Sequence, residues 1–191
     1  LIGTIRISIQ EFKRVQMSLD RIRLASLHNK VMSAEQAAQF IEDGMTVGMS
    51  GFTRAGEAKA VPLALVQQAK ANPLKITLIT GASLGNDLDK QLTEAGVLAR
   101  RLPFQVDNTL RKAINKGEVM FIDQHLSETV EQMRNQQLKK PDVAVIEAVA
   151  ITEDGGIIPT TSVGNSASFA IFAEKVIVEI NTNLSPAFEG L

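Results

Sequence analysis

Residues 142–147 read Asp-Val-Ala-Val-Ile-Glu, an apolar run with a carboxylate at each end. Consecutive apolar residues without polar alternation are typical of a strand covered by other layers on both faces. Residues 176–180 repeat the pattern as Val-Ile-Val-Glu-Ile, and we expect a second buried strand there. Strands of this kind occur mainly in parallel sheets, because the crossover helices of such sheets cover both faces. The two runs therefore predict a parallel sheet between layers of helices.

Strand and helix patterns alternate around these runs along residues 31–191. Shorter strands are predicted at 45–50, 75–80, 97–101 and 118–122, and helices at 33–43, 60–71, 88–94, 109–115, 127–137 and 165–173. The first helix begins with a capping box at Ser33 and Gln36 and ends before Gly44. Strands separated by helices of this length favour βαβ units. The predicted fold class is α/β, with a largely parallel sheet flanked by helices, and ligands should bind at the carboxyl ends of its strands.

The composition excludes several kinds of site. The chain has 191 residues, of which 45% are hydrophobic and 21% charged, and its formal net charge is −1. This balance is typical of a globular domain and gives no electrostatic reason to bind nucleic acid or an anionic membrane. There is no Cys, which excludes disulfides, thiolate ligands and a Cys nucleophile, and only His28 and His125 supply imidazoles. We therefore expect no metal site, no nucleic-acid partner and no membrane partner.

Both ends of the chain are unusual. Residues 1–30 begin with Leu1 and contain six Lys or Arg against two Asp or Glu. A basic segment poor in acids fits a mitochondrial targeting peptide. The alternative is a mis-assigned or vector-derived extension before a natural start near Met17, which fits the lack of a sustained helical face. We favour the extension, partly non-native or flexible, and hence a cytoplasmic protein. We take 31–191 as the domain and expect the chain to be truncated after it, with a second domain absent.

The most distinctive segment contains Gly48, Gly51 and Gly56, where the predicted strand 45–50 runs into a glycine loop. Glycines let the backbone approach a ligand closely, and a helix N-terminus next to them favours an anion. The glycine spacing does not fit the dinucleotide fingerprint G-x-G-x-x-G. Gly51 and Gly56 fit the Walker A spacing, but Glu57 and Ala58 stand where that motif needs Lys and Ser or Thr. The loop is therefore either a sharp turn or a site for something other than a nucleotide phosphate.

Other strand ends also carry polar residues. The segment with Ser83 could hold a carboxylate or carbonyl, although Ser83 or Asn86 could equally cap the next helix. Glu147 could be an acid, an ion-pair partner or a solvated residue, and the similar position of Glu179 favours a structural role for at least one of the two. Residues 160–166 could donate backbone N–H groups to a ligand or cap a helix. We interpret His125 as a loop or capping residue, because no G-x-S-x-G nucleophile motif accompanies it.

Taken together, these segments resemble the acetyl-CoA hydrolase/transferase family, which includes succinyl-CoA:acetate CoA-transferases. The motifs that carry the resemblance fall in order along residues 31–191: Val47 to Pro62, Leu78 to Ser83, Pro103-Phe104 with Leu110-Arg111, Asp123 to Ser127, Val145 to Ala148, Thr152 to Gly156, and Ser162 to Ser166. The family resemblance implies a two-domain enzyme of the kind of α/β fold shared with sugar-phosphate isomerases. It also implies acyl-CoA and small carboxylates such as acetate and succinate as substrates, coenzyme A as substrate and product, and a homodimer.

The same resemblance implies covalent catalysis by a glutamate of the second domain, which lies outside this chain. That carboxylate attacks the acyl-CoA carbonyl, forms an acyl-glutamyl anhydride and then a glutamyl-CoA thioester. We assign no catalytic residue to this chain and do not assign that role to Glu147 or Glu179. The residues carried over as substrate-binding are Gly51, Phe52, Thr53, Gly56, Ser83 and Val106. Val106 stands where some relatives have a threonine, so the acyl pocket is expected to be more apolar here.

The prediction is the N-terminal domain of an acyl-CoA:carboxylate CoA-transferase or acetyl-CoA hydrolase, inactive alone. Sequence does not separate these two activities, since both pass through the same acyl-enzyme. Two alternatives stay open at this point. One is a non-catalytic module on the same fold that binds a carboxylate or a sugar phosphate, and the other is a folded fragment with only a structural role.

Overall fold

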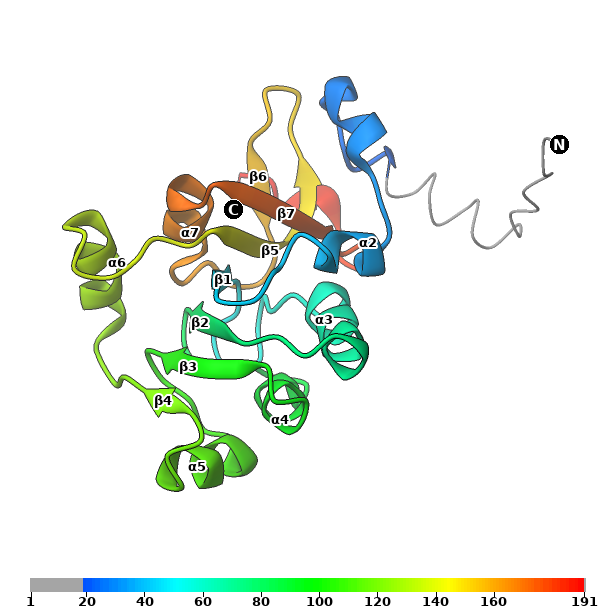
Figure 1. Ribbon diagram of the computed structural model, residues 1–191. Helices are drawn as coiled ribbons and strands as arrows, with labels where there is room; N and C mark the ends of the chain where they lie inside the picture. The colour runs from blue at the N-terminus through cyan, green and yellow to red at the C-terminus, as the bar shows by residue number, and fades with distance from the viewer. Residues whose placement is uncertain (1–18, 191) are drawn as a thin grey trace, which may run out of the picture.

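A computed structural model describes residues 19–190 of the chain as helices packed on both faces of one seven-stranded sheet (Figure 1). The strands are β1 (Thr46–Met49), β2 (Ile76–Thr80), β3 (Leu98–Leu102), β4 (Met120–Phe121), β5 (Val143–Ile151), β6 (Ile157–Pro159) and β7 (Lys175–Ile180). The helices are α2 (Ala34–Ala38), α3 (Ala60–Ala71), α4 (Leu88–Glu94), α5 (Asn108–Asn115), α6 (Leu126–Arg134) and α7 (Ser166–Phe172), with 3-10 turns η1 (Ala25–Lys30) and η2 (Pro186–Phe188). The predicted α/β class is confirmed.

The sheet is parallel except at one strand. Its order is β4-β3-β2-β1-β5-β6, and β7 pairs with β5. Strands β1 to β5 and β7 run parallel, whereas β6 pairs antiparallel with the second half of β5. Gly155 and Gly156 lie in the turn that connects β5 to β6. The carboxyl ends of β1, β2 and β3 therefore lie along one edge of the sheet, beside the middle of β5.

The core has two main parts, one on each face. Helices α2 to α5 pack with Val47, Ile76 and Leu78 on one face. Helices α6 and α7 pack on the other through Met133 and Phe169, with Ile79 and Leu102 of the sheet. All nine residues of β5 are buried, as the apolar run at 142–147 predicted. Strand β5 is thus the central strand of the sheet, and it pairs with β1, β6 and β7.

Element boundaries follow local signals. Helix α3 spans the predicted residues, because Pro62 is tolerated in its first turn and Asn72-Pro73 stops it. The capping box at Ser33 is confirmed, with Ser33 Oγ accepting from the Gln36 N–H at 3.2 Å. The helix after it is shorter than predicted, since α2 ends at Ala38 and turns lead to β1.

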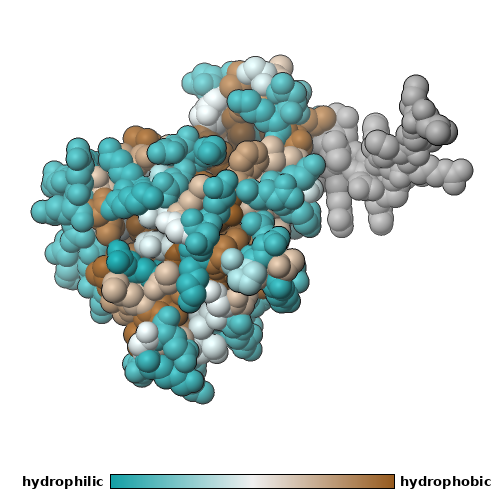
Figure 2. Space-filling model, in the orientation of Figure 1, coloured by the Kyte–Doolittle hydropathy of each residue, from teal (hydrophilic) through white to brown (hydrophobic). Residues whose placement is uncertain are grey.

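Strand β7 corrects one prediction. Its apolar sequence predicts a strand buried on both faces, but Lys175 and Val176 are exposed and Ile177–Ile180 are only half-buried. Residues of η1, α2 and β7 line an open groove of about 630 Å³. On the face drawn in Figure 2, apolar surface lies in patches among hydrophilic side chains. An apolar sequence shows that a strand can be buried under another layer. Whether β7 is fully buried depends on such a layer, which residues 19–190 do not provide.

The described residues before the predicted domain start take part in the fold. Ile22 pairs in parallel with Ile151 at the end of β5 and is buried. His28 Nε2 lies 2.6 Å from the Ile22 carbonyl oxygen. The possible extension or targeting segment before Met17 lies outside the described residues, as does the chain end at Leu191. Within residues 19–190, no helix combines the length and the apolar character needed to span a membrane.

Candidate functional site at the carboxyl edge of the sheet

The loop between β1 and α3 folds into a two-residue hairpin. The backbone N–H of Phe52 donates to Ala55 O at 2.9 Å, and that of Ala55 donates to Phe52 O at 3.2 Å. Thr53, at its tip, has a φ of 58°, a left-handed conformation that is rare for a β-branched residue. At the base, the Ser50 hydroxyl donates to Gly56 O at 2.8 Å. The loop is closed on itself and holds Thr53 at its tip in an unfavourable conformation.

Two independent features of the loop require glycine at position 56. Its φ of 69° lies in the left-handed region, and a Cβ there would stand 2.5 Å from Ser162 Oγ and 3.0 Å from Ser162 O. Ser162 in turn donates to Ala55 O at 2.7 Å. The small, polar segment 160–166 after β6 therefore packs directly against the glycine loop.

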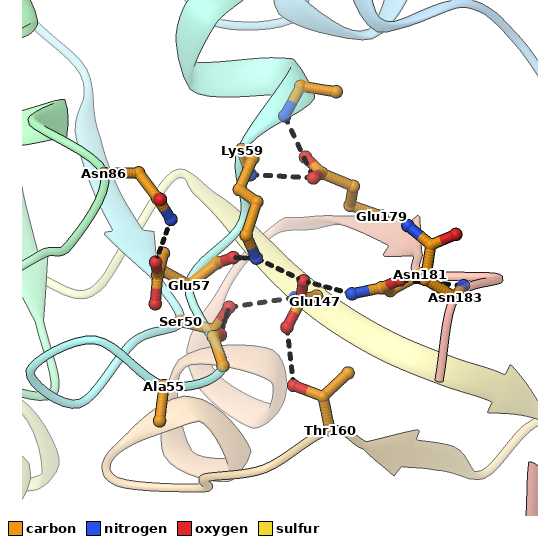
Figure 3. Close-up of polar contacts among 12 residues, drawn as sticks. Ser50, Ala55, Glu57, Lys59, Asn86, Glu147, Thr160, Glu179, Asn181 and Asn183 are labelled. Atoms are coloured by element: carbon orange, nitrogen blue, oxygen red, sulfur yellow. Dashed lines mark hydrogen bonds and ion pairs between the residues drawn. The ribbon is translucent and has the colours of Figure 1, made fainter. Parts of the chain in front are cut away.

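Glu147 joins the strand ends around this loop (Figure 3). Its Oε1 accepts from Lys59 Nζ at 2.6 Å and from Asn181 Nδ2 at 3.0 Å, and its Oε2 accepts from the Thr160 hydroxyl at 2.6 Å. Its backbone N–H donates to Ser50 Oγ at 2.9 Å. The side chain of Glu147 is 3% exposed. Of the three interpretations left open for Glu147, the structure selects the ion-pair partner, and the carboxylate connects the β1–α3 loop with the residues that follow β6 and β7.

Glu179, the register partner of Glu147 on β7, occupies the N-terminus of α3 (Figure 3). One of its oxygens accepts from the N–H groups of Lys59 and Ala60 at 2.7 and 2.9 Å, and the other from that of Val61 at 3.0 Å. A helix N-terminus attracts anions through these free N–H groups. Here the anion is the protein's own carboxylate. The helix after the glycine loop is therefore not free to bind a phosphate, in agreement with the failed nucleotide motifs.

Glu57 fills the space between the glycine loop and the loop after β2. It is 2% exposed, and its Oε1 accepts a hydrogen bond from Asn86 Nδ2. A Cβ on Gly85 would stand 2.8 Å from Glu57 Oε1. Glu57 Oε2 is buried and has no hydrogen-bond partner among residues 19–190. The carboxylate that excluded the Walker A motif thus serves as a packing element between two loops.

The loop after β2 carries Ser83, which is 3% exposed. A Cβ on Gly81 would stand 2.6 Å from Gly51 O, so the two loops touch at their backbones. The helix that follows has Asp87 at its N-cap with no side-chain cap, and hence neither Ser83 nor Asn86 caps it. The capping interpretation of Ser83 is wrong, and its buried place beside Gly51 leaves the binding role as a prediction.

An open cleft of about 630 Å³ lies next to these loops. It is lined by residues that follow β1 to β4: Phe52, Thr53, Ala82, Phe104, Asp123, Gln124, His125, Leu126 and Glu128. The structure thus brings Phe52 and Thr53 together with the segment next to Ser83. Val106 is 54% exposed and does not line the cleft. Its assignment to an acyl pocket stays a prediction.

The cleft also contains residues that sequence reasoning left out of the site. Phe104 belonged to the family-like segment, and His125 was interpreted as a loop or capping residue. His125 is the N-cap residue of α6, but its side chain makes no capping bond. The signal that could have found Phe104 and His125 is their position just after β3 and β4, since the loops after parallel strands gather at one edge.

Comparison with known proteins gives a consistent family. Residues 17–191 match the family model described as the acetyl-CoA hydrolase/transferase N-terminal domain. The chain is 46% identical over 173 residues to a succinyl-CoA:acetate CoA-transferase of Clostridium kluyveri, covering 90% of this chain and 32% of the relative. It is 40% identical over 182 residues to an acetyl-CoA hydrolase of Schizosaccharomyces pombe, covering 90% and 35%. The chain spans about a third of the length of these relatives, whose names are those of enzymes.

Solved structures agree on the fold. Glutaconate coenzyme A-transferase from Acidaminococcus fermentans superposes with a TM-score of 0.61 at 16% identity, over 78% of this chain and 68% of that one. An acyl-CoA transferase from Escherichia coli O157:H7, solved as a thioester complex with CoA, gives 0.53 at 14% identity over 82% and 44%. With relatives named as enzymes, the non-catalytic alternative is not favoured.

Proposed function

Because this chain belongs to the acetyl-CoA hydrolase/transferase family, as its N-terminal domain, we propose that it forms one wall of the acyl pocket of an acyl-CoA:carboxylate CoA-transferase or acetyl-CoA hydrolase. The observation that carries the proposal is the cleft at the carboxyl edge, in which Phe52 and Thr53 of the glycine loop face the segment beside Ser83. The cleft combines the aromatic side chains of Phe52 and Phe104 with polar residues that include Asp123 and Glu128, and the aromatic side chains suit a short acyl group. The α3 N-terminus is filled by Glu179, which argues against a phosphate there.

The proposed mechanism places the nucleophile outside this chain. Glu147 and Glu179 each accept three hydrogen bonds, so neither carboxylate is free to attack a thioester. A glutamate from another domain would attack the acyl-CoA carbonyl and expel the CoA thiolate, leaving an acyl-glutamyl anhydride. The thiolate would then attack the glutamyl carbonyl of this anhydride, which releases the first carboxylate and leaves a glutamyl-CoA thioester. The residues of this chain would hold the acyl group in place and limit the access of water to the intermediate.

The finer assignments belong to the same proposal. Coenzyme A is taken as substrate and product, with acetate and succinate as the carboxylates. We place the domain at residues 31–191 and propose a cytoplasmic homodimer. The substrate-binding set stays as predicted: Gly51, Phe52, Thr53, Gly56, Ser83 and Val106.

The test is an assay of the full-length gene product with acetyl-CoA in the presence and absence of succinate. A CoA-transferase forms succinyl-CoA and releases little free thiol, whereas a hydrolase releases CoA thiol at full rate without an acceptor. Borohydride reduction after incubation with acyl-CoA should inactivate the enzyme only if a glutamyl-CoA thioester forms. Absence of both succinyl-CoA formation and thiol release would contradict the proposal.

A further inference from the structure

The most completely buried ion pair among residues 19–190 joins Asp89 of α4 to Arg101 of β3. Their side chains are 1% and 0% exposed. Arg101 Nε donates to Asp89 Oδ1 at 2.8 Å, and Nη2 donates to Oδ2 at 3.1 Å. This two-point contact fixes the guanidinium and the carboxylate in one plane. Neither group is accessible from the cleft, so the pair does not itself bind a ligand.

Two further hydrogen bonds of the pair lie on either side of Ser83. Arg101 Nη2 also donates to Ala82 O at 3.0 Å, and Asp89 Oδ2 accepts from the Leu84 N–H at 3.3 Å. The peptide groups on both sides of Ser83 are therefore held by the same ion pair. Arg101 Nη1 donates in addition to Leu102 O, at the start of the segment that leads to the cleft.

The constraint extends to the glycine loop. Leu84 Cδ2 is 3.0 Å from the point that a Cβ on Gly51 would occupy, so Leu84 packs against the backbone of Gly51. Gly81 and Gly51 touch at the other end of the Ser83 segment. A shift of Ala82 or Leu84 would therefore change the position of Gly51 next to Phe52.

A β-bulge selects Arg101 for this role. In the pairing of β2 with β3, Ile76 faces Leu98 and Thr77 faces Arg100, so Ala99 is an extra residue. Leu98 packs on the face of α3 and α4, and Leu102 packs on the opposite face, although the two are four positions apart. In a regular strand these two leucines would share one face, and Arg100 would share it with Leu98. The bulge turns Arg101 toward Asp89 instead, and bulges that redirect a side chain are common next to active sites.

We propose that the Asp89–Arg101 ion pair is a positioning pair for the acyl pocket, which fixes the peptide groups on both sides of Ser83 and, through Leu84, the Gly51 end of the glycine loop. The inference rests on the proposed function, with Ser83 as a pocket residue. Buried ion pairs often add no stability over apolar side chains of the same volume. A requirement for stability alone therefore does not explain the pair, whereas a requirement for fixed positions at the pocket does.

The test compares Asp89→Leu/Arg101→Met with the wild type and with Arg100→Met, all in the full-length protein. Arg100 is the neighbouring arginine that the bulge turns away, and it makes a matched control. The double variant should still unfold cooperatively, with a melting temperature lowered by several degrees, because the Leu84 N–H and the Leu102 carbonyl lose their partners while apolar side chains replace the ion pair itself. Its Leu84 amide should exchange about tenfold faster relative to that of Leu78, since the acceptor is lost. The KM for succinate should rise about tenfold with a smaller change in kcat, because binding geometry is lost and the chemistry is not.

Unchanged Leu84 exchange and unchanged KM in a folded double variant would overturn the proposal, as would equal effects from Arg100→Met. The wild type could also prove to have no CoA-transfer or hydrolysis activity while the double variant still shows faster Leu84 exchange. That result would support the positioning of the loop and contradict the proposed function. If the double variant fails to fold, Arg101→Lys serves instead, because lysine keeps the charge but loses the forked donors to Ala82 and Leu102. A KM for succinate unchanged by Arg101→Lys would overturn the proposal.

Discussion

The two edges of the sheet are built differently. At the carboxyl edge, polar side chains are buried and joined by hydrogen bonds between residues far apart in sequence, as Glu147 is to Lys59 and Ser50. At the amino edge, the closing contacts also join residues far apart in sequence, but they are exposed or only partly buried, as between Asp43 and the Lys75 N–H at 2.7 Å or Asp142 and the Thr46 N–H at 2.7 Å. Both edges belong to the same strands and the same apolar core. The difference therefore comes from the loops and not from the sheet.

The two edges differ in the free-energy cost of burying polar side chains. Burying a polar side chain is unfavourable unless all its hydrogen bonds are made. Glu147 meets this requirement, whereas Glu57 leaves one oxygen without a partner among residues 19–190. A fold with no site at this edge could close its loops with small turns, as the amino edge does. The buried polar contacts hold the loops in one arrangement, which is what a pocket for a reacting group requires.

The largest expected effect comes from Glu147→Leu. The change leaves the Thr160 hydroxyl and the Asn181 amide without their acceptor, and we expect a loss of about 3 kcal/mol in the free energy of unfolding. Lys59 contributes less, because its side chain is 41% exposed and water replaces the lost ion pair. Urea denaturation measures the loss, and Glu147→Gln, which keeps an acceptor oxygen, should lose about half as much. A loss below that of Asp142→Asn would contradict the difference between the two edges.

Gly56→Ala and Gly44→Ala sharpen the comparison with one chemical change at each edge. Both glycines have a positive φ, 69° and 78°, so alanine strains both by about 1 kcal/mol. A Cβ at Gly44 meets nothing within 4 Å, whereas one at Gly56 meets Ser162. We expect Gly56→Ala to lose about 1 kcal/mol more free energy of unfolding than Gly44→Ala. Only Gly56→Ala should also lower the CoA-transfer activity. Equal losses of stability and activity would show that the packing of Gly56 against Ser162 has no special role.

Sequence patterns predicted the sheet and the edge at which the site lies, because both depend on local periodicity and on a general rule for parallel strands. Helix α3 was predictable to the residue from Pro62 and Asn72-Pro73. The exposure of β7 was not predictable, since Val176 and Ile177 are as apolar as the buried residues of β5, and only the structure shows that Val176 is exposed and Ile177 half-buried.

The contacts within the site were less predictable than the site itself. Arg100 and Arg101 are equivalent in sequence, and only the bulge at Ala99 decides which of them meets Asp89. Glu147 and Glu179 are also equivalent in sequence, each in an apolar strand, yet Glu147 joins the β1–α3 loop to the residues after β6 and β7, and Glu179 caps α3. These outcomes depend on register between strands distant in sequence, which no local pattern contains.

Asp142→Asn tests the amino edge through pH. Burial raises the pKa of Asp142, but hydrogen bonds from Lys139 and from the Thr46 N–H outweigh it, so the pKa lies below its usual value. A lowered folded-state pKa means that the carboxylate stabilises the fold above the unfolded value of about 3.9 and that this stability is lost as the pH falls through the folded pKa. At pH 7 the variant should be less stable by about 1 kcal/mol.

The difference between wild type and Asp142→Asn should therefore shrink as the pH is lowered from 6 to 3, in thermal unfolding followed by circular dichroism. CoA-transfer activity should not change, because Asp142 lies at the edge opposite the cleft. A difference that grows toward low pH would contradict the direction of the pKa shift.

The smallest expected effect, Thr53→Gly, separates stability from function at the carboxyl edge. Thr53 has a φ of 58° at the tip of the loop hairpin, and Gln136 has a φ of 60° after α6. Glycine relieves the left-handed strain of about 1 kcal/mol at either position. Part of this gain is offset, because glycine raises the conformational entropy of the unfolded chain. Each variant should therefore gain about 0.5 kcal/mol in the free energy of unfolding, measured by thermal unfolding. Strained backbone at a site is kept only where the surrounding structure uses the conformation. Thr53→Gly should therefore raise the KM for acetyl-CoA, whereas Gln136→Gly should leave it unchanged. The same gain in stability with no change in KM for either variant would show that the strain at Thr53 has no part in the pocket.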